Sequence, residues 1–160
     1  AEEFFGLLML IDANPGTIFA LHLKEDSREL FKRVGDCLKP FGNFFLFATD
    51  FPQGNFITNM SGVLGKSKLA LYVDGKDFEQ DLADKVEFLW LDESRDNTYE
   101  RLSFFTGLKK KIICCSPELF MNAENKDIER FKLTLLTNRE EVFGICTDYC
   151  LEYSEQIQCS

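Results

Sequence analysis

Apolar and polar stretches follow one another along the chain in lengths that predict short strands and helices in turn. The run Val86–Leu91 is apolar, rich in aromatic and branched residues, and too short for a stable helix, so it predicts a buried strand. A polar stretch, Asp92–Thr98, follows it. Apolar residues then recur at helical spacing, as Leu102, Phe105 and Leu108. Strand, polar turn and helix form the repeating half of an α/β sheet.

The first third of the chain shows the same alternation. Thr17–Leu23 predicts a strand, Ser27–Phe41 a helix capped by the Ser27 side chain, and Asn43–Asp50 a second strand. The apolar stretch Phe4–Ile11 precedes them and fits either a first strand or a buried helical turn. This part therefore reads as β-α-β.

The segment Phe51–Lys68 is rich in Gly, Asn, Ser and Thr and predicts at most one short helix. We expect a soft domain boundary here, with residues 1–65 as an N-terminal β-α-β segment and residues 66–160 as a second domain. In the second domain a Thr137–Glu140 capping box predicts the start of the last helix. The expected elements around Val86–Leu108 are the strand Lys68–Val73, the helix Lys76–Lys85, the strands Ile112–Cys115 and Glu129–Leu136, which would pair antiparallel, and the helix Thr137–Ile157.

Composition narrows the class of protein. The chain carries 27 acidic against 18 basic residues, a formal charge of −9, which argues against nucleic acid as a partner. The apolar fraction of 45% is that of a globular protein, and no apolar run approaches the roughly 20 residues that a membrane span needs. Weak calcium binding is compatible with the acidity, although such acidity more often serves solubility.

The six cysteines leave the compartment open. Neighbouring residues in a strand point to opposite faces, so Cys114 and Cys115 are poor disulfide partners. Cys37, Cys115 and Cys146 read most simply as small buried apolar residues. The chain has one histidine, His22, and no paired C-x-x-C motif, so we expect no zinc site and no cofactor.

Lys85–Lys111 resembles the redox-inactive b′-type domains of the protein disulfide isomerase family. The resemblance lies in a hydrophobic strand that ends in Asp (Phe88–Asp92), an Asp96-Asn97 turn, a helix that ends in Phe104-Phe105, and the stretch Gly107–Lys110. Thr137–Ile157 is similar to the last helix of that family, and the first third resembles the opening of a preceding b-type domain. The resemblance implies a thioredoxin-like α/β fold, with a central mixed sheet flanked by helices and an additional N-terminal β-α-β segment.

The resemblance also implies a function. Neither candidate first helix opens with C-x-x-C, so thiol–disulfide exchange of the usual kind is not expected, and we expect a non-catalytic module rather than an enzyme. Such a module would bind unfolded polypeptides or partner domains in the endoplasmic reticulum lumen or elsewhere in the secretory pathway, with the cytoplasm as the alternative. Its site would be an apolar patch between the first and last helices: Phe78, Leu82, Val142, Cys146 and Tyr149.

Three alternatives stay open at this point. The five patch residues could simply pack the helical layer against the sheet. The chain could instead be an acidic calcium-buffering or scaffold protein similar to calsequestrin, although its acidic residues are spread along the sequence. A thiol enzyme using Cys146 and Cys150 is the third, and it lacks the helix N-terminal field that lowers a thiol pKa.

Overall fold

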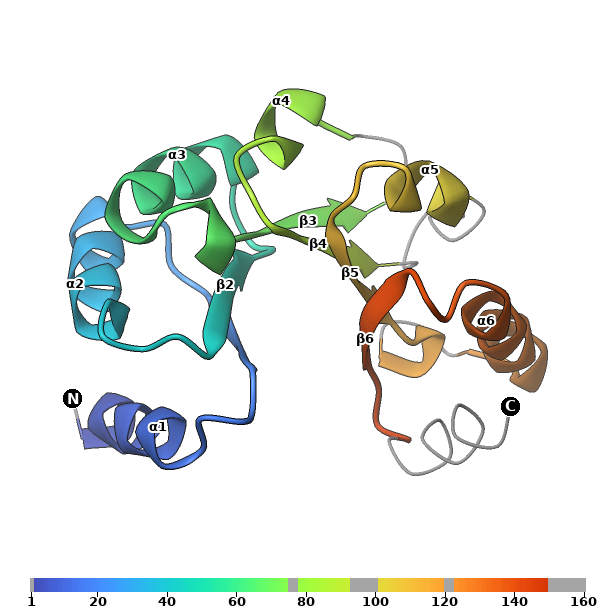
Figure 1. The fold of residues 1–160 in the computed structure, drawn as a ribbon, viewed down its shortest axis with the longest axis horizontal. Coiled ribbons are helices and arrows are strands. Elements are labelled where there is room, and N and C mark those ends of the chain that lie inside the picture. Colours follow the sequence, from blue (N-terminus) through green and yellow to red (C-terminus); the bar gives the residue numbers. More distant parts are fainter. Residues whose placement is uncertain (1, 75–77, 93–100, 120–122, 150–160) are drawn as a thin grey trace. The chain divides into compact units, whose positions relative to one another are not determined.

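The computed structural model describes residues 2–74, 78–92, 101–119 and 123–149 (Figure 1). The chain divides into two compact units. Unit 1 comprises Ala1–Tyr72 and Glu79–Phe88, and unit 2 comprises Val73–Phe78 and Leu89–Ser160. The division at residue 65 that the sequence suggested stays a prediction.

Helices and strands alternate from one end of the described chain to the other, which confirms an α/β fold. The elements up to β3 are α1 (Glu2–Ala13), β1 (Phe19–Leu23), α2 (Arg28–Leu38), β2 (Phe44–Ala48), α3 (Gln53–Leu64), a 3₁₀ helix (Lys66–Lys68) and β3 (Ala70–Asp74). The elements after it are α4 (Gln80–Ala83), β4 (Phe88–Asp92), α5 (Leu102–Thr106), β5 (Lys111–Cys115), a 3₁₀ helix (Pro117–Leu119), α6 (Asn125–Thr137) and β6 (Val142–Cys146).

The strands lie in the order in which they occur in the chain. Strands β1 and β2 pair parallel, with Phe19 opposite Phe44. An isolated parallel bridge joins Leu46 of β2 to Leu69, next to β3, and the remaining strands have the order β3-β4-β5-β6. Strand β6 pairs parallel with β5. The antiparallel pair expected near the C-terminus is therefore wrong, and the thioredoxin-like assignment stays a prediction.

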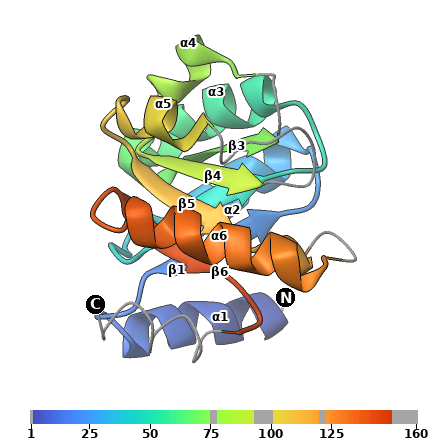
Figure 2. The same cartoon turned by 90° about the vertical axis from the view of Figure 1, so that its right-hand side faces the viewer.

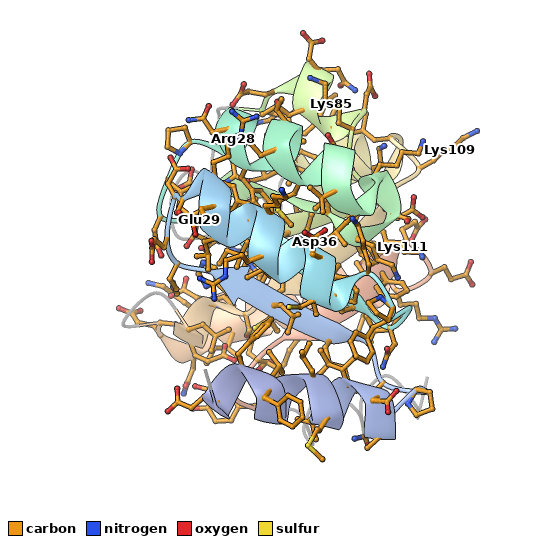
Figure 3. All side chains as sticks on the ribbon, turned by 90° about the vertical axis from the view of Figure 1, so that its left-hand side faces the viewer. Arg28, Glu29, Asp36, Lys85, Lys109 and Lys111 are labelled. Carbon is orange, nitrogen blue, oxygen red and sulfur yellow. The ribbon has the colours of Figure 1, made fainter. Side chains whose placement is uncertain are left out.

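Helix α2 is the helix that the sequence predicted best. The Ser27 hydroxyl accepts a hydrogen bond from the Leu30 N–H at 3.3 Å and caps it, and Phe31, Val34 and Leu38 are buried. Cys37, expected to be buried, is exposed. The charged residues Arg28, Glu29 and Asp36 lie along the exposed side of this helix (Figure 3).

The segment expected to be mostly irregular forms α3, a helix of 12 residues. Its Phe56, Ile57 and Met60 are buried, and it packs against α2 where Gly35 offers no side chain. Packing of this apolar face outweighs the low helix propensity of its glycines and asparagines. Of the two alternatives for Phe4–Ile11 the helix is correct, since α1 covers it, but the expected burial is wrong, because Phe5, Met9 and Leu10 are exposed.

The expectations near the C-terminus are wrong in detail. Glu129–Leu136, expected as a strand, belongs to α6, which ends at Thr137, where the last helix was expected to begin. The capping box is formed by Glu124 and Asp127, not by Thr137 and Glu140. Figures 1 and 2 show α6 covering one face of the β5–β6 pair. Phe131 and Leu135 of this helix are buried.

Two expectations fall partly outside the described residues. Most of the polar turn before α5 lies at residues 93–100, and of the expected helix Lys76–Lys85 only Gln80–Ala83 is helical among the residues that the structure describes.

Candidate functional site

The five residues of the predicted apolar patch lie on four different segments. Phe78 is half-buried and packs against two aromatic rings of α5, with centroids 5.5 Å from Phe104 and 5.3 Å from Phe105. Leu82 belongs to α4 in unit 1 and is buried. The role of both residues in binding stays a prediction.

The other three patch residues are not helical. Val142 and Cys146 lie on strand β6, and Tyr149 follows that strand with its side chain exposed. The Tyr149 N–H donates to the Thr147 hydroxyl at 3.0 Å. The prediction that these three residues lie on the last helix and face the first helix is therefore wrong. Their role in binding stays a prediction.

Three large apolar side chains of α1, Phe5, Met9 and Leu10, are exposed, and we call the part of the helix that they form the α1 surface. Their exposed fractions are 64%, 60% and 52%. Phe5 and Met9 lie one helical turn apart, so they form one continuous surface. Ile11, by contrast, is fully buried. Helix α1 thus packs through one side and leaves an apolar side in water.

Asn43 fastens the C-terminal end of α1 to the start of β2. Its side-chain N–H₂ group donates to the carbonyl oxygens of Ile11 (3.1 Å), Asn14 (2.9 Å) and Thr17 (3.0 Å). The backbone carbonyl oxygen of Asn43 in turn accepts a hydrogen bond from the Phe19 N–H at 2.9 Å. These bonds hold the C-terminal end of α1, next to Met9 and Leu10, in place.

Acidic residues border the α1 surface. Glu3 and Asp12 are exposed near the two ends of the helix, whose sequence EEFFGLLMLIDA contains no basic residue. A partner that covers this surface would meet apolar side chains flanked by negative charge.

A sequence signal for this surface exists in the run Phe4–Ile11. It contains no charged residue, so a helix formed from it cannot hide all of its apolar positions against one neighbour. The sequence interpretation missed the surface because it treated the run as buried.

A polar cluster lies where β1 and β2 end, the edge at which parallel α/β sheets commonly bind ligands. The His22 ring is 4.4 Å from the Phe47 ring, centroid to centroid, and stacks on it. His22 Nε2 lies 2.9 Å from the Thr49 hydroxyl, and Lys24 pairs with Asp50 at 3.3 Å. Burial and, secondarily, the Lys24 charge lower the pKa of His22, against the opposing effect of Asp50.

The Thr49 hydroxyl also lies 3.1 Å from Asp50 Oδ1, so it can donate its single proton to that carboxylate or, when Nε2 carries no proton, to His22. Together with the stacking on Phe47, this contact fixes the orientation of the His22 ring.

In unit 2 a second polar cluster surrounds the end of β6. Glu118 accepts hydrogen bonds from the hydroxyls of Ser116 and Thr147, which ties the 3₁₀ helix after β5 to the chain after β6. Cys146 stands opposite Cys115 in the parallel register, and the two thiols are hydrogen-bonded to each other.

Across the residues that the structure describes, no group of three or more His, Cys, Asp or Glu side chains is arranged to hold a metal ion. Within the same residues, every helix is too short or too polar to cross a membrane. Comparisons of the chain with protein-family models, with curated proteins and with solved structures found no match.

Proposed function

We propose that this chain is a non-catalytic α/β module that binds segments of other polypeptides, and that the α1 surface is where it binds them. The observation that carries the proposal is the exposure of Phe5, Met9 and Leu10 on a helix whose C-terminal end Asn43 holds in place. Contiguous apolar surface on an ordered element is typical of a site for another protein. The resemblance of Lys85–Lys111 to b′-type domains supports the same class of function.

The non-catalytic part of the proposal rests on the sequence, in which neither candidate first helix opens with C-x-x-C. The thioredoxin-like assignment and a location in the secretory pathway belong to the same proposal and rest on the resemblance alone.

The exposed fractions of Phe5, Met9 and Leu10 limit the free energy that a partner gains by covering them. Full burial of a large apolar side chain contributes about 1.5–3 kcal/mol, and the three side chains are a little more than half exposed, so covering them contributes about 3–5 kcal/mol in total. The loss of translational and rotational freedom opposes this gain. The α1 surface by itself therefore supports only weak, transient binding, with a Kd of about 1 mM or weaker.

The negative charge around the α1 surface affects which apolar peptide segments bind to it. Glu3 and Asp12 flank the surface, and the whole chain carries a formal charge of −9. An apolar segment with basic flanks would gain from both, whereas the same segment with acidic flanks would be repelled. We expect the preferred ligand to be an unfolded or amphipathic polypeptide segment that is apolar at its centre and basic at its ends.

The test is an NMR titration of the ¹⁵N-labelled chain with such a peptide up to millimolar concentration. The double variant Phe5→Ser/Met9→Ser should lose the saturable shifts of the α1 amides. Leu133→Ser removes an exposed leucine from α6 and serves as the matched control, so it should bind like the unmodified chain.

Unchanged binding by the α1 double variant would refute the proposed site. Equal loss in the Leu133→Ser control would show that binding is a general response to apolar surface. Replacing the basic flanks of the peptide by acidic ones should weaken binding, and most strongly at low salt.

A further inference from the structure

We propose that Cys115 and Cys146 form a reversible redox pair, which a small disulfide such as oxidised glutathione converts into a cross-strand disulfide between β5 and β6. The two residues are direct partners in the parallel register. Neighbouring strands lie about 4.7–4.9 Å apart, which falls within the Cα separation of about 4.4–6.8 Å that disulfides require. Partners in a parallel pair also point to the same face of the sheet.

The two side chains are close enough to interact. A hydrogen bond between the thiols shifts the pKa of each, and the register places both residues side by side without any movement of the backbone. Cys114, the chain neighbour of Cys115, points to the opposite face of β5 and is buried there. The geometry therefore selects one of the two adjacent cysteines.

The two thiols differ in the way that a disulfide exchange needs. The hydrogen bond from Cys115 lowers the pKa of Cys146, against burial and the charges of Asp148, Glu118 and Asp92. The same hydrogen bond, and then burial, raise the pKa of Cys115, with smaller contributions from Cys146, Asp92 and Cys114. Cys146 is also partly exposed, whereas Cys115 is buried. Cys146 is thus the sulfur that an external disulfide reaches first.

The reaction proceeds in two exchanges. The Cys146 thiolate attacks one sulfur of glutathione disulfide, whose S–S bond breaks, and one glutathione thiolate leaves. Cys115 then loses its proton to that thiolate or to solvent and attacks the Cys146 sulfur, which releases the second glutathione. Overall the two protein thiols lose two electrons and two protons, and one glutathione disulfide is reduced to two thiols.

The pair lies in a position where a covalent bond has a structural effect. Strand β6 is the last strand in the order β3-β4-β5-β6. A disulfide at Cys115 and Cys146 would fasten it to β5 at the end where Glu118 already bridges Ser116 and Thr147. Oxidation would therefore lock the final strand onto the sheet.

The experiment uses the full chain with Cys37, Cys150 and Cys159 replaced by Ser, which leaves three cysteines. The protein is incubated with glutathione disulfide, denatured, treated with N-ethylmaleimide and weighed by mass spectrometry. We expect the loss of two hydrogen atoms, no retained glutathione and a single maleimide adduct. Adding Cys114→Ala should leave this yield unchanged, whereas adding Cys115→Ala should lower it at least tenfold.

Stable glutathione adducts without loss of hydrogen would overturn the proposal. So would a disulfide that persists in the Cys115→Ala variant, because it would have to use Cys114. Far-UV circular dichroism checks that each variant is folded. If Cys115→Ala does not fold, the cross-linked peptide from the three-cysteine chain is fragmented between Cys114 and Cys115. The fragment masses then show which of the two is bonded to Cys146.

Discussion

Helix α3 packs closely on α2 at Gly35, which makes this residue a sensitive place to test the packing. A Cβ atom added there would lie 2.5 Å from Val63 Cγ1, 3.3 Å from Val63 Cβ and 3.5 Å from Met60 Cε. Real carbon atoms do not approach to 2.5 Å, so Gly35→Ala forces a shift. Val63 cannot simply rotate away, because a valine in a helix has one strongly preferred χ1 rotamer.

Two opposing terms set the size of the effect. Replacing glycine by alanine inside a helix contributes about 0.8–1.0 kcal/mol, while overpacking a filled contact costs about 1–3 kcal/mol. Gly62 in α3 is the matched control, since no heavy atom lies within 4 Å of its added Cβ. Gly62→Ala should therefore stabilise the protein, and Gly35→Ala should be about 1–3 kcal/mol less stable than Gly62→Ala.

Urea unfolding followed by far-UV circular dichroism measures both variants, and Trp90 fluorescence reports on unit 2 separately. A second pair in a Val63→Ala background completes the cycle. Removing the branched methyls should relieve the clash, so that Gly35→Ala becomes as favourable there as Gly62→Ala. Equal stabilisation by Gly35→Ala and Gly62→Ala in the otherwise unmodified chain would refute the close packing of α2 on α3.

Two further predictions follow from unit 1. Asn43→Ala removes the donor that three carbonyl oxygens share, so we expect a loss of about 1–3 kcal/mol and faster hydrogen exchange of the α1 amides; unchanged exchange in α1 would contradict the role of Asn43. The pKa of His22 is lower in the folded chain than its ordinary value of 6.5, so the unfolded chain binds the proton more readily and stability should fall as the pH drops through 6.5. Denaturant midpoints between pH 7.5 and 5.5 measure this fall, which His22→Gln should reduce; an identical slope in the variant would contradict it.

The sequence was most informative where local and tertiary preferences agree. Helix α2 combines a capping Ser27 with buried residues at helical spacing, and it lies almost where the pattern predicted. The strands around Leu46 and Leu89 are buried on both faces, and a short apolar run without alternation is the signature of such strands.

The sequence interpretation was wrong where one spacing of apolar residues fits both a strand and a helix. Phe131, Leu133 and Leu135 alternate as in a strand, but Phe131 and Leu135 are also one helical turn apart. In the structure these two are buried, and Leu133 is 66% exposed. Because this segment was interpreted as a strand, the last helix was expected at residues that form β6. Val142 and Cys146 were therefore expected on a helix and lie on a strand.

The candidate sites depended on information that the sequence does not contain. The contact between Cys115 and Cys146 follows from the register of two strands separated by a whole helix, which no local pattern fixes. The α1 surface required knowing which side of the apolar run Phe4–Ile11 meets the rest of unit 1. The residue types of both sites could be found in the sequence, but the sequence did not show that these residues lie next to one another in the fold.

The chain-order arrangement of the strands has a consequence for how the protein folds. Each pairing joins strands that are consecutive in sequence, so it closes a loop of one helix and its connections. The entropy lost in closing a loop grows only slowly with its length, and it is smallest when pairings stay this local. Parallel sheets usually fold slowly because their contacts are distant in sequence. Within each of the two sheets, pairing can therefore begin at any neighbouring pair of strands and extend by one strand at a time, as in repeat proteins.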